Sequence, residues 1–144
     1  MSFDLIALLH RATHAVSLQI AEIPDTDVNQ PEAHILAHLH ATGTSRVGGI
    51  HVAFGHRRST LTSVLDRLED RKLIKRTADV HDRRAIVVSL TPGGKAVATR
   101  VYRALSDAEA KVLRGFSKQQ IAAFRKIAEA FAEQLPEPRR AAHR

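Results

Sequence analysis

A run of small hydroxyl and basic side chains in the middle of the chain could bind a polyanion. Its candidate residues are Arg57, Arg58, Ser59, Thr60, Thr62, Ser63 and Arg67. Hydroxyl groups and guanidinium groups are the donors and acceptors with which proteins contact phosphates and the edges of bases. If the run is helical, most of these side chains share one face, opposite the apolar Leu61, Val64, Leu65 and Leu68. The alternative is an ordinary surface helix that is rich in small polar residues.

A second basic cluster, Asp82-Arg83-Arg84, lies between two segments that are rich in β-branched residues. An aspartate and an arginine two residues apart on a tight β-tip can hold each other, which lowers the entropy lost when the arginine enters a minor groove. The alternative is a solvated surface pair that contributes ~0 to 1 kcal/mol. Arg46, Lys75 and Arg76 are further candidates for phosphate contacts.

The charge of the chain is concentrated in the same region. The net charge is +7, and residues 46–103 hold 13 basic and 5 acidic side chains, so the two flanks together are close to neutral. A cationic segment suits a nucleic acid, because each neutralised phosphate releases counterions. A basic surface without a partner is the alternative that charge alone leaves open.

The surrounding pattern predicts the elements that position these residues. Apolar residues at three- and four-residue steps predict helices over residues 3–20, from Pro31 to about residue 40, over 58–72, from Pro92 to Gly115 and over 118–135. Thr44 or Ser45 is expected to cap a further short helix that Gly48 and Gly49 weaken and Gly55 ends. Residues 73–77 and 85–90 are expected to pair as two antiparallel strands around the charged tip, residues 79–84. Thr91 and Ser117 are the predicted caps of the last two helices.

The order of these elements is that of a winged helix-turn-helix: a short helix, a sharp turn, a polar-faced helix and a basic hairpin. The predicted fold is mainly α with a small antiparallel β-wing. We expect one domain over residues 1–144, with the winged helix-turn-helix at 31–91, dimerisation helices at 1–22 and 92–135, and a flexible basic tail at 136–144.

From Thr60 through Leu73-Ile74-Lys75-Arg76 to Gly94, the sequence resembles the MarR family of winged-helix regulators. The resemblance implies a dimer of triangular outline that binds a pseudo-palindromic operator. It implies that Arg84 enters the minor groove, that Asp82 braces it and that Arg83 lies nearer the phosphates. It also implies a small aromatic or anionic effector. The chain departs from the family at Lys72, where glycine is usual, and at Arg57, where a small capping residue is common.

A homodimer is also expected from the apolar stripes of the terminal helices. These stripes include Leu5, Leu9, Ile121, Phe124, Phe131 and Leu135, which is more apolar surface than a small winged-helix core can cover. We therefore expect a sequence-specific regulator of transcription that binds double-stranded DNA, a repressor released by an effector. The open alternatives are an architectural module that binds DNA without sequence preference, a protein-interaction module, and a histidine-based metal sensor.

Several other classes find no support in the sequence. The absence of cysteine excludes disulfides and thiolate sites. No apolar run approaches the roughly 18 residues of a membrane span, so we expect a cytoplasmic, nucleoid-associated protein. No nucleophile elbow, phosphate loop or HExxH helix occurs, so neither an enzyme nor a cofactor is expected. His10 with His14 and His34 with His38 have the i, i+4 spacing of helical metal ligands, but no carboxylate completes either pair.

Overall fold

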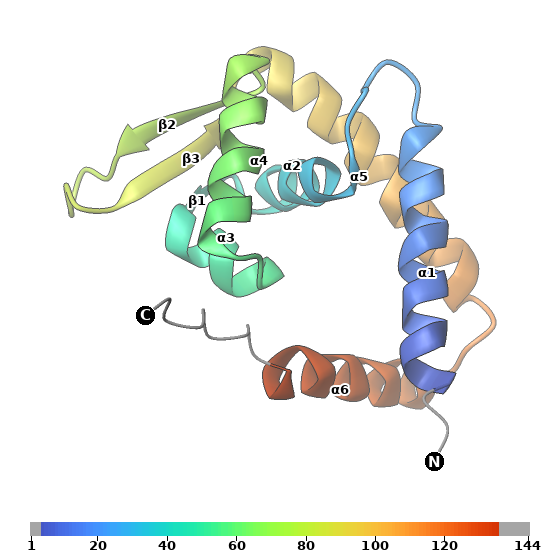
Figure 1. The fold of residues 1–144 in the computed structure, drawn as a ribbon. Coiled ribbons are helices and arrows are strands. Elements are labelled where there is room, and N and C mark those ends of the chain that lie inside the picture. Colours follow the sequence, from blue (N-terminus) through green and yellow to red (C-terminus); the bar gives the residue numbers. More distant parts are fainter. Residues whose placement is uncertain (1–3, 136–144) are drawn as a thin grey trace, which may run out of the picture. The chain divides into compact units, whose positions relative to one another are not determined.

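The computed structural model describes residues 4–135, which form six helices and three strands (Figure 1). In chain order these are α1 (Asp4–Ala21), α2 (Gln30–Thr42), β1 (Thr44–Arg46), α3 (Val47–Phe54), α4 (Arg58–Asp70), β2 (Ile74–Ala78), β3 (Ile86–Leu90), α5 (Pro92–Leu113) and α6 (Lys118–Gln134). The chain divides into two compact units, with the boundary in the sequence between Asp107 and Ala108. No helix within residues 4–135 is long and apolar enough to cross a membrane. The predicted tail, 136–144, lies outside the described residues.

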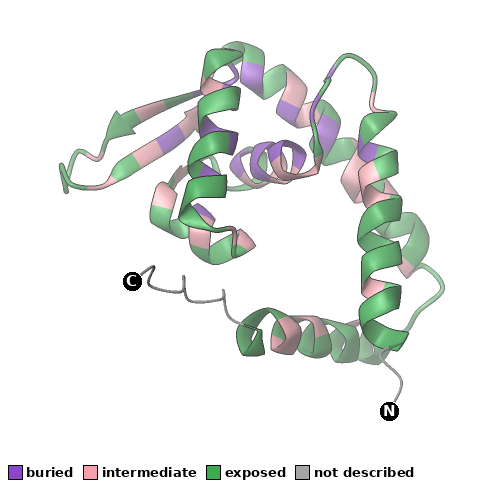
Figure 2. Cartoon of the chain, in the orientation of Figure 1, coloured by how far each residue is buried: buried purple, intermediate pink, exposed green. Residues whose placement is uncertain are grey.

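The core of the first unit is built around α2 and α4, which carry about half of the buried residues in Figure 2. The stripe Leu61, Val64, Leu65 and Leu68 is buried as its spacing predicts. Ile35, Leu36 and Leu39 of α2 are fully buried, as is Val88 of β3. Because one face of α4 is fixed by this packing, the opposite face is held outward as a rigid surface.

The sheet has three strands in the order β1-β3-β2, all antiparallel, so the prediction of a two-stranded wing was incomplete. Residues Thr44 and Ser45, predicted to cap α3, lie in β1 instead, where Ser45 pairs with Val88. The Ser45 hydroxyl is bonded to His38 Nε2 at 3.1 Å and to Thr42 Oγ1 at 3.2 Å. Arg46 occupies the N-cap position, and α3 therefore begins without a side-chain cap. Gly55 ends α3 in the predicted left-handed conformation, with φ 65°.

The turn after α4 and the start of α5 are joined by the side chain of Thr91 and by the close approach of Gly94. Lys72, which stands where the resembled family usually has glycine, adopts the left-handed conformation, with φ 58°. Thr91 is the N-cap of α5, as predicted: its Oγ1 accepts from the Gly94 N–H at 2.9 Å and donates to the Lys72 carbonyl at 2.6 Å. Gly94 packs so closely that a Cβ there would lie 1.7 Å from the Leu73 carbonyl oxygen. The start of α5 thus anchors both β2 and the end of α4.

In the second unit, the predicted cap of α6 is confirmed. Ser117 and Gln120 form a reciprocal capping box, in which each side chain accepts from the backbone N–H of the other residue. This arrangement satisfies two of the N–H groups that a helix N-terminus leaves without partners.

Candidate nucleic-acid interface

The outward side of α4 carries a polar face, which comprises Ser59, Thr60, Thr62 and Ser63. All four residues are exposed. The Thr62 hydroxyl donates to the Arg58 carbonyl at 2.8 Å and the Ser63 hydroxyl to the Ser59 carbonyl at 3.0 Å. A hydroxyl that donates within its own helix still has lone pairs with which to accept, and it can rotate to donate outward. The polar face can therefore make hydrogen bonds of both senses to an external partner.

Arg57 and Arg58 lie at the start of this helix, and both are exposed. Arg57 occupies the N-cap position with no side-chain hydrogen bond to the helix, so its side chain contributes no cap. Both side chains thus keep their guanidinium donors beside the polar face. The sequence prediction groups these residues with the hydroxyl residues, and the structure places them together.

The structure places Arg67 away from that group. Its Nε donates to Glu32 Oε1 of α2 at 3.0 Å, and the Glu32 side chain is only 7% exposed. Glu32 also lies 3.6 Å from the Arg71 guanidinium and completes a capping box with Asn29 at the start of α2. Sequence reasoning missed Glu32 as a partner, although the Asn-x-x-Glu spacing of a capping box was visible. Arg67 therefore joins α4 to α2.

Arg76, predicted to contact phosphate, is held by two carboxylates of α4. Its guanidinium donates to Asp66 Oδ1 at 2.6 Å and to Glu69 Oε2 at 2.7 Å. The hydrogen bond to Asp66 is the main reason why the pKa of Arg76 is raised, and Glu69 contributes in the same sense. Two negative charges offset this cation, so Arg76 fastens β2 to α4, whereas the neighbouring Lys75 is exposed.

The tip of the wing is organised by Asp79, which the sequence prediction passed over. Its carboxylate accepts from the backbone N–H of His81 at 2.7 Å, from that of Asp82 at 3.3 Å and from Arg46 Nε at 2.8 Å. The bond from His81 is the first of the causes that hold the pKa of Asp79 below its usual value, and Arg46 also lowers it. One carboxylate thus orders the tip and ties it to β1.

Asp82 does not brace the guanidinium of Arg84, which corrects the prediction from sequence. Its Oδ1 accepts from the backbone N–H of Arg84 at 3.1 Å. In a tight turn, the N–H group two residues ahead is the donor nearest to an aspartate side chain. Arg83 and Arg84 are both exposed on the resulting tip. Asp82 therefore shapes the backbone from which the arginine side chains extend.

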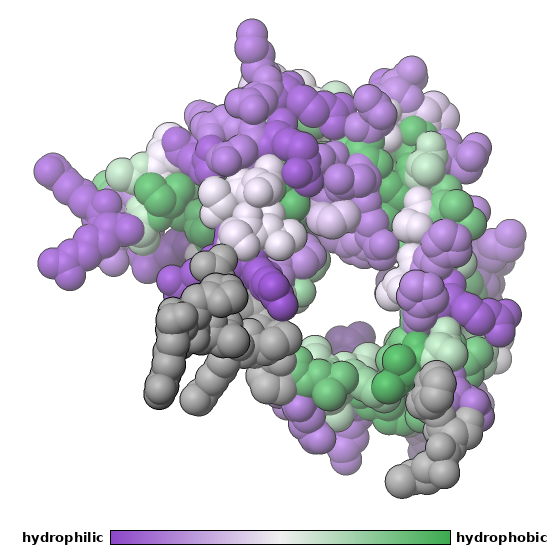
Figure 3. Space-filling view, in the orientation of Figure 1, coloured by the Kyte–Doolittle hydropathy of each residue, from purple (hydrophilic) through white to green (hydrophobic). Residues whose placement is uncertain are grey.

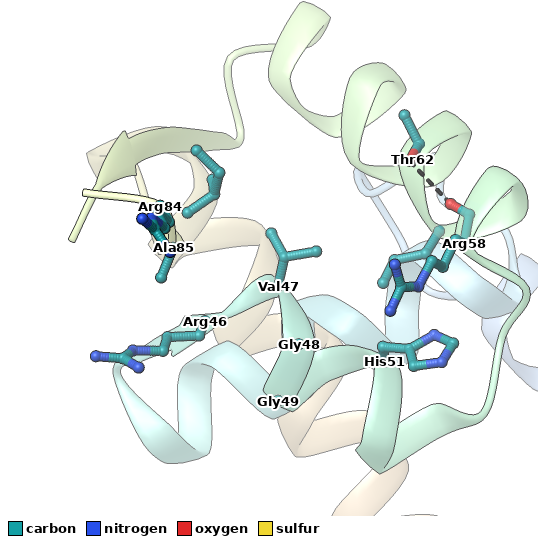
Figure 4. A pocket seen from close by; sticks show the side chains of 11 residues that line it. Arg46, Val47, Gly48, Gly49, His51, Arg58, Thr62, Arg84 and Ala85 are labelled. Carbon is teal, nitrogen blue, oxygen red and sulfur yellow. Dashed lines mark hydrogen bonds between the residues drawn. The ribbon is translucent and has the colours of Figure 1, made fainter. Parts of the chain in front are cut away.

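Between α4 and the wing lies a cleft of about 480 Å³. Arginines from three segments line it: Arg46 of β1, Arg58 of α4 and Arg84 of the wing. Gly48 and Gly49 of α3 lie between them, and Figure 4 shows the wing arginine and Arg58 on opposite sides of these glycines. The cleft combines three arginines with two α3 positions that carry no side chain, beside apolar residues such as Val47 and Ile86. Its positive charge suits an extended anion.

The histidines predicted as weak metal candidates do not form a metal-binding cluster among the described residues. The rings of His10 and His14 are stacked on the exposed side of α1, with centroids 6.4 Å apart. His34 and His38 both pack edge-on against the ring of Phe54. Burial lowers the pKa of His34, and the charge of nearby His56 lowers it further. His34 and His38 thus contact α3 through the ring of Phe54.

Comparison with known proteins defines the class. Residues 28–86 match the model of the MarR family. An uncharacterised HTH-type transcriptional regulator of Bacillus subtilis (strain 168), YfiV, is 34% identical over 83 residues, which are 58% of this chain and 52% of that relative. The match thus spans about half the length of the relative.

Two solved structures extend the similarity to most of the chain. A MepR-like protein complexed with pseudoligands is 25% identical, with 90% of this chain and 92% of that chain covered and a TM-score of 0.69. MepR of S. aureus in its DNA-binding conformation is 18% identical, with 94% and 100% covered and a TM-score of 0.79. At that identity, the second likeness shows the fold alone.

The fold is therefore that of a winged helix-turn-helix protein, with α3 and α4 as the helix pair and β2 and β3 as the wing. Within that class, the match of residues 28–86 confirms the resemblance to the MarR family of regulators that the sequence suggested.

Proposed function

We propose that this protein is a sequence-specific regulator of transcription that binds double-stranded DNA as a homodimer and acts as a repressor. The observation that carries the proposal is the cleft between α4 and the wing, which is lined by arginines from three segments of the chain. A major groove admits one α-helix, and a hairpin beside that helix reaches the adjacent minor groove. The relatives support the proposal, since YfiV is named a transcriptional regulator and MepR has a DNA-binding conformation.

In this proposal, each segment has a distinct role. The residues that contact bases or nearby phosphates from α4 are Arg57, Arg58, Ser59, Thr60, Thr62 and Ser63. Arg84 enters the minor groove, and Arg83, Arg46 and Lys75 contact phosphates. Asp79 and Asp82 shape the wing without touching DNA. Arg67 and Arg76, which are committed to carboxylates, hold α4 against α2 and β2.

Substitution of Arg84 tests the proposal directly. The preferred DNA sequence is first selected from a random pool, and binding is then measured by fluorescence anisotropy at fixed salt. Arg84→Ala should weaken binding by about tenfold or more (~1.4 kcal/mol). Because Arg84 is exposed and its side chain makes no contact in the core, its loss should leave the melting temperature unchanged.

The matched control is Arg103→Ala, which removes the same charge from an exposed position on α5. It should change the affinity much less than Arg84→Ala. Equal affinities of the wild type and Arg84→Ala would contradict the role of the wing. A pool from which no preferred sequence emerges would favour the architectural alternative, because specific and nonspecific binders differ in the ratio of their affinities.

The dimer is proposed from apolar side chains that each unit leaves exposed. On α1, Leu5 and Leu8 are 59% and 50% exposed. Phe124 of α6 is 61% exposed, and Leu135, which directly follows α6, is 66% exposed. Figure 3 shows hydrophobic side chains along the visible side of α6. A second copy of the chain would cover such faces and supply the second half-site that a pseudo-palindromic operator requires.

Light scattering at micromolar concentration should give twice the monomer mass of 15.9 kDa. Phe124→Lys should shift this mass towards the monomer, because a charge would then be buried between the copies. Val52→Lys is the control, since Val52 is 82% exposed on α3, outside the proposed interface. A monomeric wild type would contradict the proposed assembly.

We further propose that a small aromatic or anionic effector releases the DNA. The MepR-like protein was solved with pseudoligands, which supports ligand binding by this fold. Aromatic carboxylates titrated into the complex of the protein with its selected DNA should lower the anisotropy, and no response to any such acid would contradict the effector.

A further inference from the structure

Two adjacent glycines in α3 lack a structural explanation in the fold itself. Gly48 and Gly49 lie in the first half of an eight-residue helix, where glycine is less stable than alanine. Neither residue has a positive φ, and a Cβ at either position would meet nothing within 4 Å. Neither backbone geometry nor packing therefore requires glycine at these positions.

Both glycines lie where a ligand could occupy the space that a side chain would otherwise fill. They are exposed and form part of the lining of the cleft, between Arg58 on one side and Arg84 on the other (Figure 4). Arg46, the third cation of the cleft, is fixed through its Nε by Asp79 at 2.8 Å, while its side chain remains 54% exposed. The three arginines thus lie around two helical positions without side chains, which are flanked in α3 by Val47.

We propose that Gly48 and Gly49 keep the floor of the cleft open for the sugar-phosphate strand of DNA that separates the major from the minor groove. The inference rests on the proposed function. When α4 occupies a major groove and the wing the adjacent minor groove, the strand between those grooves passes between α4 and the wing. A side chain at either position would project into the space that this strand occupies. DNA binding then explains why α3 contains two glycines that lower the stability of the helix.

The charges of the cleft agree with this occupant. A phosphodiester strand carries a negative charge at every nucleotide, and the cleft presents cations from β1, α4 and the wing rather than from one element. Phosphate contacts position a protein on the duplex but carry no sequence information. Filling the floor should therefore weaken binding to all duplexes by a similar factor, whereas the loss of a base contact would weaken binding mainly to the preferred sequence.

The test is a graded series of variants at the two positions: Gly48→Ala, Gly48→Leu, Gly49→Ala and Gly49→Leu. The alanine variants should melt at the same or a higher temperature than the wild type, because alanine favours the helix. Their affinity for DNA should nevertheless fall about threefold, and the affinity of the leucine variants should fall more than about tenfold. Both losses should be similar for the selected sequence and for an unrelated duplex. Ala96→Leu, on an exposed site of α5, controls for the added apolar bulk.

Replacement of single phosphates by neutral methylphosphonates locates the strand. In the wild type, replacement of a phosphate between the two contacted grooves should weaken binding the most. The same replacement should weaken the binding of Gly49→Leu by a smaller factor. The inference is overturned if the folded variants bind as well as the wild type, or if only the selected sequence is affected. In both cases the proposed function stands, because it is tested separately, by whether the wild-type protein selects and binds a preferred duplex.

Discussion

Replacement of Gly94 by alanine should lower the free energy of unfolding by about 3 kcal/mol, the upper end of the range for overpacked sites. The added methyl group would lie 1.7 Å from the Leu73 carbonyl oxygen and 2.7 Å from the carbonyl carbon. A clash with backbone cannot be relieved by a change of rotamer. The start of α5 would have to move away from β2, with loss of the hydrogen bonds through which Thr91 joins Lys72 to Gly94.

Gly93→Ala is the matched control one residue earlier. A Cβ there would meet its nearest neighbours at 3.9 and 4.0 Å, which is ordinary van der Waals contact. Urea denaturation should give Gly93→Ala the midpoint of the wild type or a slightly higher one. Similar midpoints for the two variants would show that the close approach of α5 to Leu73 is not rigid.

The parts of the fold that the sequence predicts well are those with a strong local signal. The period of Leu61, Val64, Leu65 and Leu68 fixes α4 and its buried face, and Thr91 and Ser117 cap the helices where expected. β1 was missed because a three-residue strand has no periodicity of its own. It forms through pairing with β3, which lies more than forty positions further along the chain.

In the candidate site, too, features set by nearby residues could be predicted from the sequence, whereas contacts between residues far apart in the chain could not. Exposure of the hydroxyl residues of α4 follows from the buried face opposite them, so the sequence was sufficient to group them. The partners of Arg67 and Arg76 were not predictable in this way, because Glu32 is 35 positions from Arg67 and Asp66 is 10 positions from Arg76. Charge in a sequence identifies candidates for a polyanion site, and only tertiary pairing shows which cations are already neutralised.

The pairing of Arg67 leads to the second large effect, at Glu32. Glu32→Ala should reduce the free energy of unfolding by about 2 kcal/mol, less than the 3–5 kcal/mol of a fully buried pair. The reduction is smaller because the side chains of Arg67 and Arg71 are 49% and 37% exposed and remain partly solvated. The variant also loses the hydrogen bond that the Asn29 N–H donates to Glu32 Oε2 at 3.2 Å, which closes the capping box of α2.

Glu32→Gln separates the two contributions. Glutamine can still accept from the Asn29 N–H, so the cap survives while the charge is lost. This variant should lose about half as much stability as Glu32→Ala, and the exposed Glu22→Ala should stay within about 0.5 kcal/mol of the wild type. Equal losses for the alanine and glutamine variants would assign the whole effect to charge. A negligible loss for both would mean that apolar packing alone holds α4 against α2, with Arg67 then available to DNA.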